Sequence, residues 1–301
     1  MVKARIAVVG AGLMGHGIAQ VFATAGHDVT ITDAVSASLD TAKSRISANL
    51  KDLGDDPAAV DRVTLERDLA AAVRSADYVV EAVSENLELK QKLFADIEAN
   101  VRPDTILASN TSVIPITAIM GGLKRRERAL GTHWWNPPYL VPLVEVIATE
   151  WTTPAAIDFT MKLHADVGKT PVHVKKDVPG FVGNRLQHAL WREAISLVEN
   201  DICDAETVDT VIKAAFGRRL AVLGPLENAD LVGTDLTLAI HQTVLAAIDA
   251  RPGPSPYLEK LVAQGKLGMK TGEGFRAWTP EQQAELRARV LRHLKAARES
   301  G

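Results

Sequence analysis

The stretch "ARIAVVGAGLMGHG" at residues 4–17 joins a short apolar run to a glycine-rich segment, and it decides the fold. Gly10, Gly12 and Gly15 follow the spacing G-x-G-x-x-G, and a helical pattern continues over 16–25. Gly10 permits a tight turn, Gly12 lets a pyrophosphate approach the backbone, and Gly15 permits close helix–strand packing. This context predicts a strand–turn–helix that binds a dinucleotide at the helix N-terminus. A glycine-rich turn without a ligand is the alternative.

An acidic residue downstream of this turn indicates which dinucleotide binds. Asp33 ends the second strand-like run, 18 residues after Gly15, where a carboxylate binds the ribose hydroxyls of NAD. It would repel the additional phosphate of NADP, and no arginine follows it, so NAD is the expected cofactor. The alternative is that Asp33 or Ser36 caps a helix. The contacts expected in this region are Gly10, Gly12, Leu13, Met14, Gly15 and Asp33.

The first part of the chain alternates strand-like and helical patterns. Short apolar runs lie at 4–10, 27–32, 77–83, 105–109, 128–133, 140–147 and 170–175. Amphipathic stretches such as 36–52, 86–100 and 154–167 separate them. This alternation predicts an α/β fold, a doubly wound Rossmann-type sheet of parallel strands with helices on both faces.

The pattern changes after residue 177, where strand signals end. Helical patterns cover 181–200, 204–216, 228–249 and 279–298. We therefore expect an NAD-binding domain over 1–177 and an all-helical substrate and dimerisation domain over 178–301. Its apolar helix faces fit either contact with a second copy or an ordinary intrachain core.

Composition restricts the class of protein. The 301 residues are 47% hydrophobic with a formal net charge of −3, which favours neither nucleic acid nor a membrane surface as partner. Cys203 is the single cysteine, so an intrachain disulfide is excluded. The N-terminus enters a strand without a signal-peptide pattern, and no apolar run reaches the length of a membrane span. We expect a cytoplasmic protein.

The segment "GTHWWNPPYLVPLVEVI" at 131–147 contains a candidate acid–base pair. His133 and Glu145 are 12 residues apart, one after a strand-like run and the other within the next. Histidine is suited to proton transfer near neutral pH, and a carboxylate on its far nitrogen would orient it. A satisfied core histidine is the ordinary alternative.

Several motifs occur in an order that carries a family resemblance. They are the glycine-rich turn, "VEAVSENLELKQKLF" (80–94), "ASNTS" (108–112), "HWWNP" (133–137), "PLVEVI" (142–147), "DVPGFVGNRL" (177–186) and "GMKTGEGF" (268–275). Together they resemble the L-3-hydroxyacyl-CoA dehydrogenase family over nearly the whole chain. The resemblance implies NAD-dependent oxidation of the 3-hydroxyl of an acyl substrate in fatty acid metabolism, and a homodimer.

The resemblance also implies roles for individual residues. His133 and Glu145 match the family's general-base pair, and Ser112 and Asn184 match residues that bind the reacting oxygen. Asn110 and Asn136 match positions lining the cofactor or substrate site, and Glu85 and Lys90 match positions near the nicotinamide; no metal is implied. Ordinary alternatives are a helix cap for Ser112, a surface amide for Asn184, and solvated charges for Glu85 and Lys90.

Two departures leave the substrate open between a CoA thioester and a small free acid. The segment 34–77 is shorter and more acidic than the lysine-rich hairpin of acyl-CoA members. The segment 136–146 is more similar to members acting on L-gulonate, carnitine or a pyridine-carboxylate alcohol. Arg218 and Arg219 could bind a substrate carboxylate, or form a solvated turn.

Two other classes are also open. A non-catalytic NAD-binding sensor would not need His133, Glu145, Ser112 and Asn184 together, so their joint presence favours an enzyme. The lysine-dependent β-hydroxyacid dehydrogenases share the glycine-rich start and helical second part. They carry a catalytic lysine on a central helix, and 181–200 contains no lysine.

Overall fold

The structure, a computed structural model, describes residues 3–300. An eight-stranded sheet has the order β3-β2-β1-β4-β5-β6-β7-β8. Its strands are β1 Arg5–Val9, β2 Asp28–Thr32, β3 Val63–Leu65, β4 Tyr78–Glu81, β5 Ile106–Ser109, β6 Ala129–Trp134, β7 Leu143–Ile147 and β8 Thr170–Val174. The pair β6–β7 is antiparallel and the other pairs are parallel. The predicted Rossmann-type α/β sheet is confirmed.

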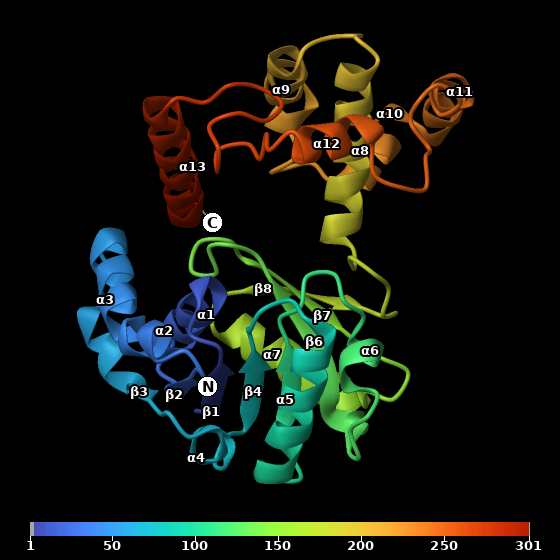
Figure 1. Ribbon diagram of the computed structural model, residues 1–301. Helices are drawn as coiled ribbons and strands as arrows, with labels where there is room; N and C mark the ends of the chain where they lie inside the picture. Colours follow the sequence, from blue (N-terminus) through green and yellow to red (C-terminus); the bar gives the residue numbers. More distant parts are fainter. Residues whose placement is uncertain (1–2, 301) are drawn as a thin grey trace. The chain divides into compact units, whose positions relative to one another are not determined.

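Helices cover both faces of this sheet (Figure 1). They are α1 Leu13–Thr24, α2 Ser36–Asp40, α3 Ala42–Leu53, α4 Leu69–Val73, α5 Leu87–Asn100, α6 Ile116–Met120 and α7 Pro154–Asp166, with 3₁₀ turns η1 Pro57–Arg62 and η2 Arg126–Arg128. Side chains alternate along each strand, so Ile6 and Val8 pack with α1, α3 and α7 while Ala7 and Val9 pack with α4, α5 and α6.

The structure differs from the sequence expectation in its short elements. Strand β3 has only three residues, too few for an alternation of apolar and polar residues to be recognised in the sequence. Helices α4 and α6 have five residues each, too few for a helical period of apolar residues. The stretch 36–52 forms two helices, α2 and α3, rather than one. Strand β7 runs antiparallel to β6 because the connection between them contains no crossover helix, which a parallel return usually requires.

The second part of the chain is helical, as predicted. Its helices are α8 Gly183–Glu199, α9 Ala205–Ala214, α10 Pro225–Val232, α11 Thr234–Val244, α12 Pro256–Ala263 and α13 Pro280–Ser300, with the 3₁₀ turn η3 Phe216–Arg218. The stretch 228–249 is divided at Gly233, and α12 was not predicted. Among residues 3–300, no helix is long and apolar enough to cross a membrane.

The chain folds into two compact units, and their boundaries differ from the one expected after residue 177. The first unit runs to Arg185 and includes the segment from His293, and the second is Leu186–Arg292. Residues 178–185 belong to the first unit because Phe181 is buried in the core under α5 and α6. The segment from His293 belongs there because Lys295 and Arg298 of α13 form ion pairs with Asp52 and Asp55 at the end of α3.

The second unit has almost no buried core of its own. Between Leu186 and Arg292, all of which the structure describes, Ser255 and Leu261 are the only buried residues. Large apolar side chains stand in solvent, and Val222, Leu226 and Leu231 are between 72% and 86% exposed. Apolar surface of this extent usually marks a site of interaction.

A buried aromatic cluster lies between α1, α7 and the sheet. The rings of Phe22, Tyr78 and Trp134 lie between 5.1 and 5.9 Å from the ring of His164. His164 is fully buried and its Nδ1 donates a hydrogen bond of 2.7 Å to the carbonyl of Thr160. Burial disfavours the imidazolium ion and lowers the pKa of His164 to about 4.

We expect this histidine to make the protein sensitive to acid. An unfolded histidine binds its proton at about pH 6.5, so below that pH protonation favours the unfolded state. Between pH 7.5 and pH 5, His164 should cost about 2 kcal/mol of unfolding free energy. Urea denaturation at both pH values measures this loss of stability. The variant His164→Leu should reduce the loss. The control His173→Gln, at an exposed position, should leave it unchanged. An equal loss in His164→Leu would contradict the assignment.

Candidate active site

The glycine-rich turn lies between β1 and α1 and leaves space for a ligand. Gly10 has φ of 106°, and an added Cβ would lie 2.6 Å from the carbonyl oxygen of Ala82. A Cβ on Gly15 would lie 1.7 Å from the carbonyl oxygen of Gly10. A Cβ on Gly12 would meet no atom within 4 Å. Gly10 and Gly15 are therefore required by the protein's own packing, whereas Gly12 borders open space.

The start of α1 is suited to an anion. Gly12 is its N-cap and has no side chain, so no side chain caps the helix. The amides of the first turn are thus available, and Leu13 on that turn is 66% exposed. With the open space beside Gly12, this end of α1 fits the pyrophosphate of a dinucleotide.

Asp33 lies beside the turn, as the sequence predicted. Its carboxylate accepts hydrogen bonds from the amides of Ala11, at 2.6 Å, and Val35, at 2.7 Å. Asp33 is not a helix cap, because α2 has Val35 at its N-cap position. Its carboxylate is held at the end of β2, next to the turn.

An arginine that the sequence reasoning missed also touches this turn. Arg45 of α3 donates to the carbonyl oxygens of Ala11 and Ser38, both at 2.7 Å. It lies 12 residues beyond Asp33, too far along the chain for the sequence to connect it with the turn. Its guanidinium is bound to backbone carbonyls, so it braces the turn.

A buried charge cluster lies at the carboxyl end of β4. Lys90 is fully buried, and its Nζ lies 2.6 Å from Oε1 of Glu81 and 3.3 Å from Oε2 of Glu85. Oε1 of Glu85 accepts hydrogen bonds from the amides of Ser112 and Val113 at 2.9 and 3.2 Å. The alternative of a solvated charge is wrong for Lys90, and the sequence reasoning missed Glu81.

The pKa of Glu85 reflects this environment. Half-burial alone would raise it, but hydrogen bonds from Thr111 and the backbone amides, together with the charge of Lys90, outweigh burial and lower it. Glu85 is therefore an anion that holds the loop containing Ser112.

The predicted oxygen-binding residues meet on this loop. Asn184 donates from Nδ2 to the carbonyl oxygen of Ser112 at 2.9 Å. Ser112 is exposed and is not a helix cap, because α6 begins at Ile116 with Pro115 as its N-cap. Asn110 is buried, and its Oδ1 accepts the amide of Trp134 at 2.9 Å.

His133 and Glu145 are paired across the antiparallel strands β6 and β7. The two residues are register partners, and Nδ1 of His133 lies 2.7 Å from Oε2 of Glu145. Both side chains are buried. The second oxygen, Oε1, accepts the amides of Val182 and Gly183 at 2.8 and 3.0 Å. Three donors thus satisfy the carboxylate.

These hydrogen bonds keep Glu145 ionised. Burial alone would raise its pKa, but the bonds from His133 and from the two amides outweigh burial and lower the pKa below its usual value. A carboxylate bonded to Nδ1 fixes the tautomer that carries its proton there, which leaves Nε2 as the proton-accepting nitrogen.

Two rings enclose the imidazole of His133. Trp135 and Phe181 have ring centroids 5.3 and 5.7 Å from it. Gly183 permits this packing, since a Cβ there would lie 2.5 Å from the Trp135 ring. Trp134 points to the opposite face of the sheet and joins the aromatic cluster around Phe22. Trp135 therefore packs against His133, whereas Trp134 packs into the core on the other face.

The remaining predicted residues lie elsewhere. Asn136 is exposed after β6, and Arg218 and Arg219 are exposed at η3 in the second unit. His133, Glu145, Ser112 and Asn184 all belong to the first unit, so their geometry is complete within it. Among residues 3–298, whose side chains the structure describes, no group of three or more His, Cys, Asp or Glu side chains is arranged to hold a metal ion.

Comparison with known proteins gives the same family over both parts of the chain. Residues 5–178 match the model "3-hydroxyacyl-CoA dehydrogenase, NAD binding domain", and residues 180–278 match the model "3-hydroxyacyl-CoA dehydrogenase, C-terminal domain". The chain is 39% identical to the mitochondrial hydroxyacyl-coenzyme A dehydrogenase of Homo sapiens over 288 residues, 90% of each chain.

A second kind of relative acts on a different compound. The chain is 39% identical over 298 residues to 5-formyl-3-hydroxy-2-methylpyridine 4-carboxylate 5-dehydrogenase of Mesorhizobium japonicum, covering 97% of this chain and 96% of the relative. A crystal structure of an enzyme of that name, described as an NAD⁺-dependent dismutase, superposes with a TM-score of 0.91 at 37% identity. It covers 99% of this chain and 98% of the other.

The glycines of the turn provide a test that separates folding from cofactor binding. We expect Gly12→Ala to change the unfolding free energy by no more than about 1 kcal/mol, because the added methyl group meets open space. It should weaken NAD binding about tenfold or more, because the methyl group occupies the approach of the pyrophosphate. Calorimetric titration with NAD and urea denaturation measure both effects.

Gly15→Ala is the matched comparison. Its methyl group overlaps the carbonyl of Gly10, so this variant should lose more than about 2 kcal/mol of stability. Unchanged NAD affinity in Gly12→Ala would show that the dinucleotide does not approach this glycine.

Proposed function

The chain belongs to the 3-hydroxyacyl-CoA dehydrogenase family, and on that premise we propose that His133 and Glu145 perform its acid–base chemistry. As an NAD-dependent dehydrogenase it acts on a hydroxyl group. The observation that supports the pair most directly is the bond of 2.7 Å between Nδ1 of His133 and Oε2 of Glu145.

The proton chemistry follows from this pair. Nε2 of His133 accepts the hydroxyl proton of the substrate, and the anion of Glu145 stabilises the imidazolium that forms. When bound, NAD supplies the acceptor for the hydride that leaves the carbon bearing this hydroxyl group. In the opposite direction the imidazolium returns its proton to the carbonyl oxygen.

Ser112 and Asn184 bind the reacting oxygen in this proposal. The bond from Asn184 to the backbone of Ser112 keeps the two side chains adjacent. Donors at that position stabilise the alkoxide character that develops during hydride transfer. Glu85 fixes the loop through two amides, and buried Lys90 forms ion pairs with both Glu85 and Glu81, so we assign Glu85 and Lys90 to positioning.

We infer further that Asp33 binds the ribose hydroxyls of NAD, with the pyrophosphate at the start of α1. The position of Asp33 at the end of β2 supports this role. Asn110 and Asn136 remain candidates for lining the site, and Arg218 and Arg219 for a substrate carboxylate.

For the substrate, we favour a small free carboxylic acid of the pyridine-carboxylate kind. The likeness to the Mesorhizobium japonicum enzyme covers 97% of this chain and 96% of that enzyme. The acidic segment 34–77 gives a second argument. Asp52 and Asp55 in it are paired with Lys295 and Arg298, so these two cations are neutralised within the chain and are not free to bind CoA phosphates. The 3-hydroxyacyl-CoA thioester is the second candidate, supported by the family itself.

Initial rates with the two kinds of substrate test this choice. We expect slow oxidation of NADH with acetoacetyl-CoA. We expect faster reduction of NAD with 5-formyl-3-hydroxy-2-methylpyridine 4-carboxylate, or with free L-gulonate, L-carnitine or 3-hydroxybutyrate. A fast acetoacetyl-CoA reaction with no turnover of the free acids would assign the enzyme to CoA thioesters.

The variant Glu145→Gln tests the acid–base pair. The amide oxygen can still accept the two backbone amides, but the amide nitrogen donates to Nδ1, which favours the tautomer with its proton on Nε2. We expect kcat to fall about 10²–10⁴-fold with little change in the Kd of NAD. Glu98→Gln, at a site away from His133, is the control. An unchanged kcat in Glu145→Gln would remove the pair from the mechanism.

We also propose that the chain is a homodimer formed through the second unit. The exposed apolar side chains of that unit, with Ser255 and Leu261 as its only buried residues, support this proposal. A second copy would bury the apolar surface that this unit leaves in solvent. Light scattering coupled to size exclusion should give twice 32.4 kDa at micromolar concentration. A mass of one chain would contradict the dimer.

A further inference from the structure

A cavity of about 560 Å³ lies in the first unit, away from the glycine-rich turn. Its walls come from the C-terminal half of α1, the segment between β6 and β7, the start of β8 and the end of α13. The volume is within the usual range for small-molecule sites. The function proposed above uses none of its side chains.

The cavity is separate from the dinucleotide site. The helix α1 presents the first turn, beginning at Leu13, to the cofactor and Gln20, Val21 and Thr24 to the cavity. At about 1.5 Å per residue, Thr24 lies about 16 Å along the helix from Leu13. A ligand in the cavity would not occupy the position of the pyrophosphate.

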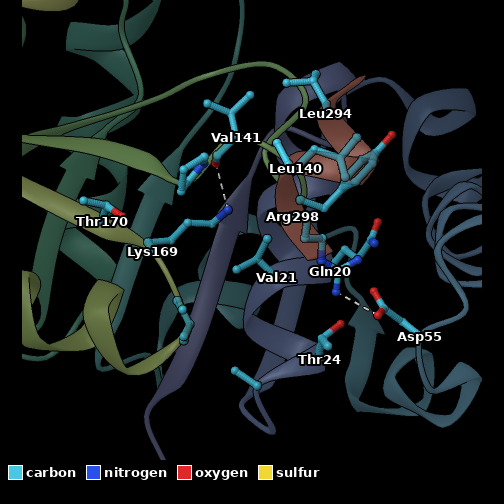
Figure 2. A pocket seen from close by; sticks show the side chains of 16 residues that line it. Gln20, Val21, Thr24, Asp55, Leu140, Val141, Lys169, Thr170, Leu294 and Arg298 are labelled. Atoms are coloured by element: carbon cyan, nitrogen blue, oxygen red, sulfur yellow. Dashed lines mark hydrogen bonds and ion pairs between the residues drawn. The ribbon is translucent and has the colours of Figure 1, made fainter. Parts of the chain in front are cut away.

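A largely buried ammonium group projects into one side of this cavity. Nζ of Lys169 donates hydrogen bonds to the carbonyl oxygens of Pro138 and of Val141. The bond to Val141, of 3.0 Å, is drawn in Figure 2. The ring of Trp134 lies 5.5 Å from the same nitrogen. Among the side chains that the structure describes, no carboxylate forms an ion pair with Lys169. The third hydrogen of the ammonium group therefore has no anionic partner.

The other charges of the cavity do not compensate Lys169. Arg298 faces it from α13 and is paired with Asp55 at 2.8 Å, on the opposite side in Figure 2. The walls thus carry two cations and one carboxylate. Burial and the repulsion of Arg298 lower the pKa of Lys169 to about 8.

Most of the remaining wall is apolar, and its polar members are Gln20, Thr24, Tyr139 and Thr170. Side chains of Val21, Leu140, Val141, Val167 and Leu294 line the space between Lys169 and the Arg298–Asp55 pair. A ligand that fills this space needs an apolar body with one anionic end. A phosphate dianion would require a second uncommitted cation, and Arg298 is already bound to Asp55.

We propose that this cavity binds a small monocarboxylate whose apolar chain or ring lies against α1 and α13 and whose carboxylate pairs with Lys169. The carboxylate supplies the negative charge that the protein does not provide there. Lys169 also holds two carbonyls of the segment joining β6 to β7, and those strands carry His133 and Glu145. The ligand would therefore bind beside the segment that joins β6 to β7, and not at His133 and Glu145.

Calorimetric titration with octanoate and benzoate tests the proposal, and octanol serves as the uncharged analogue. We expect one site per chain for an acid and much weaker binding of octanol. Lys169→Gln should weaken the acid about tenfold or more, because a charge-assisted hydrogen bond is lost. Lys162→Gln, at an exposed lysine of α7, is the matched control and should bind normally.

Two further variants make the outcome decisive. Leu294→Trp fills the cavity from α13 without touching the bonds of Lys169, so it should abolish binding even if Lys169→Gln fails to fold. Ser112→Ala alters the candidate active site and should leave octanoate binding unchanged. Binding that survives Leu294→Trp, disappears in Ser112→Ala, or is absent for both acids would overturn the proposal. Preference for octanoate or benzoate distinguishes a chain-bearing acid from an aromatic one.

Discussion

The buried carboxylate of Glu145 is the constraint on which the site depends. An ion removed from water is stable only when hydrogen bonds replace its hydration. Here the replacement comes from His133 on one side and from the amides of Val182 and Gly183 on the other. The same contacts orient a histidine and join the start of α8 to the sheet. A single charge thereby couples the tautomer of His133 to the packing of residues distant in sequence.

The antiparallel pair β6–β7 makes this arrangement possible. A short return places Glu145 directly opposite His133 in register, so both side chains lie on the same face of the sheet. The alternation of side chains sends the neighbouring Trp134 to the other face, where it packs against Phe22 and His164. Consecutive residues thus serve the site and the core.

Other charged side chains near the site also contact more than one group. Lys90 is buried between Glu81 and Glu85, and Glu85 in turn holds the amides next to Ser112. On the other side of the sheet, Asp55 binds Arg298 and so attaches the end of α13 to the first unit. Lys169 differs from Lys90, because its ammonium group donates hydrogen bonds to two carbonyls and has no carboxylate partner among the described side chains.

The sequence by itself determined the alternation of strands and helices along the chain, the glycine-rich turn and Asp33 beside it, because these depend on local periodicity and motif spacing. It indicated His133 and Glu145 as a candidate pair through the family resemblance, and the antiparallel register of β6 and β7 brings the two side chains together. It could not reveal the three-residue strand β3 or the direction of β7, since neither changes the local pattern of apolar residues. Only the tertiary structure placed Arg45 against the turn and Glu81 against Lys90. It also assigned residues 178–185 to the first unit. These features arise from contacts between segments far apart in the chain, whose partners are chosen by packing and charge and leave no periodic signal in the sequence.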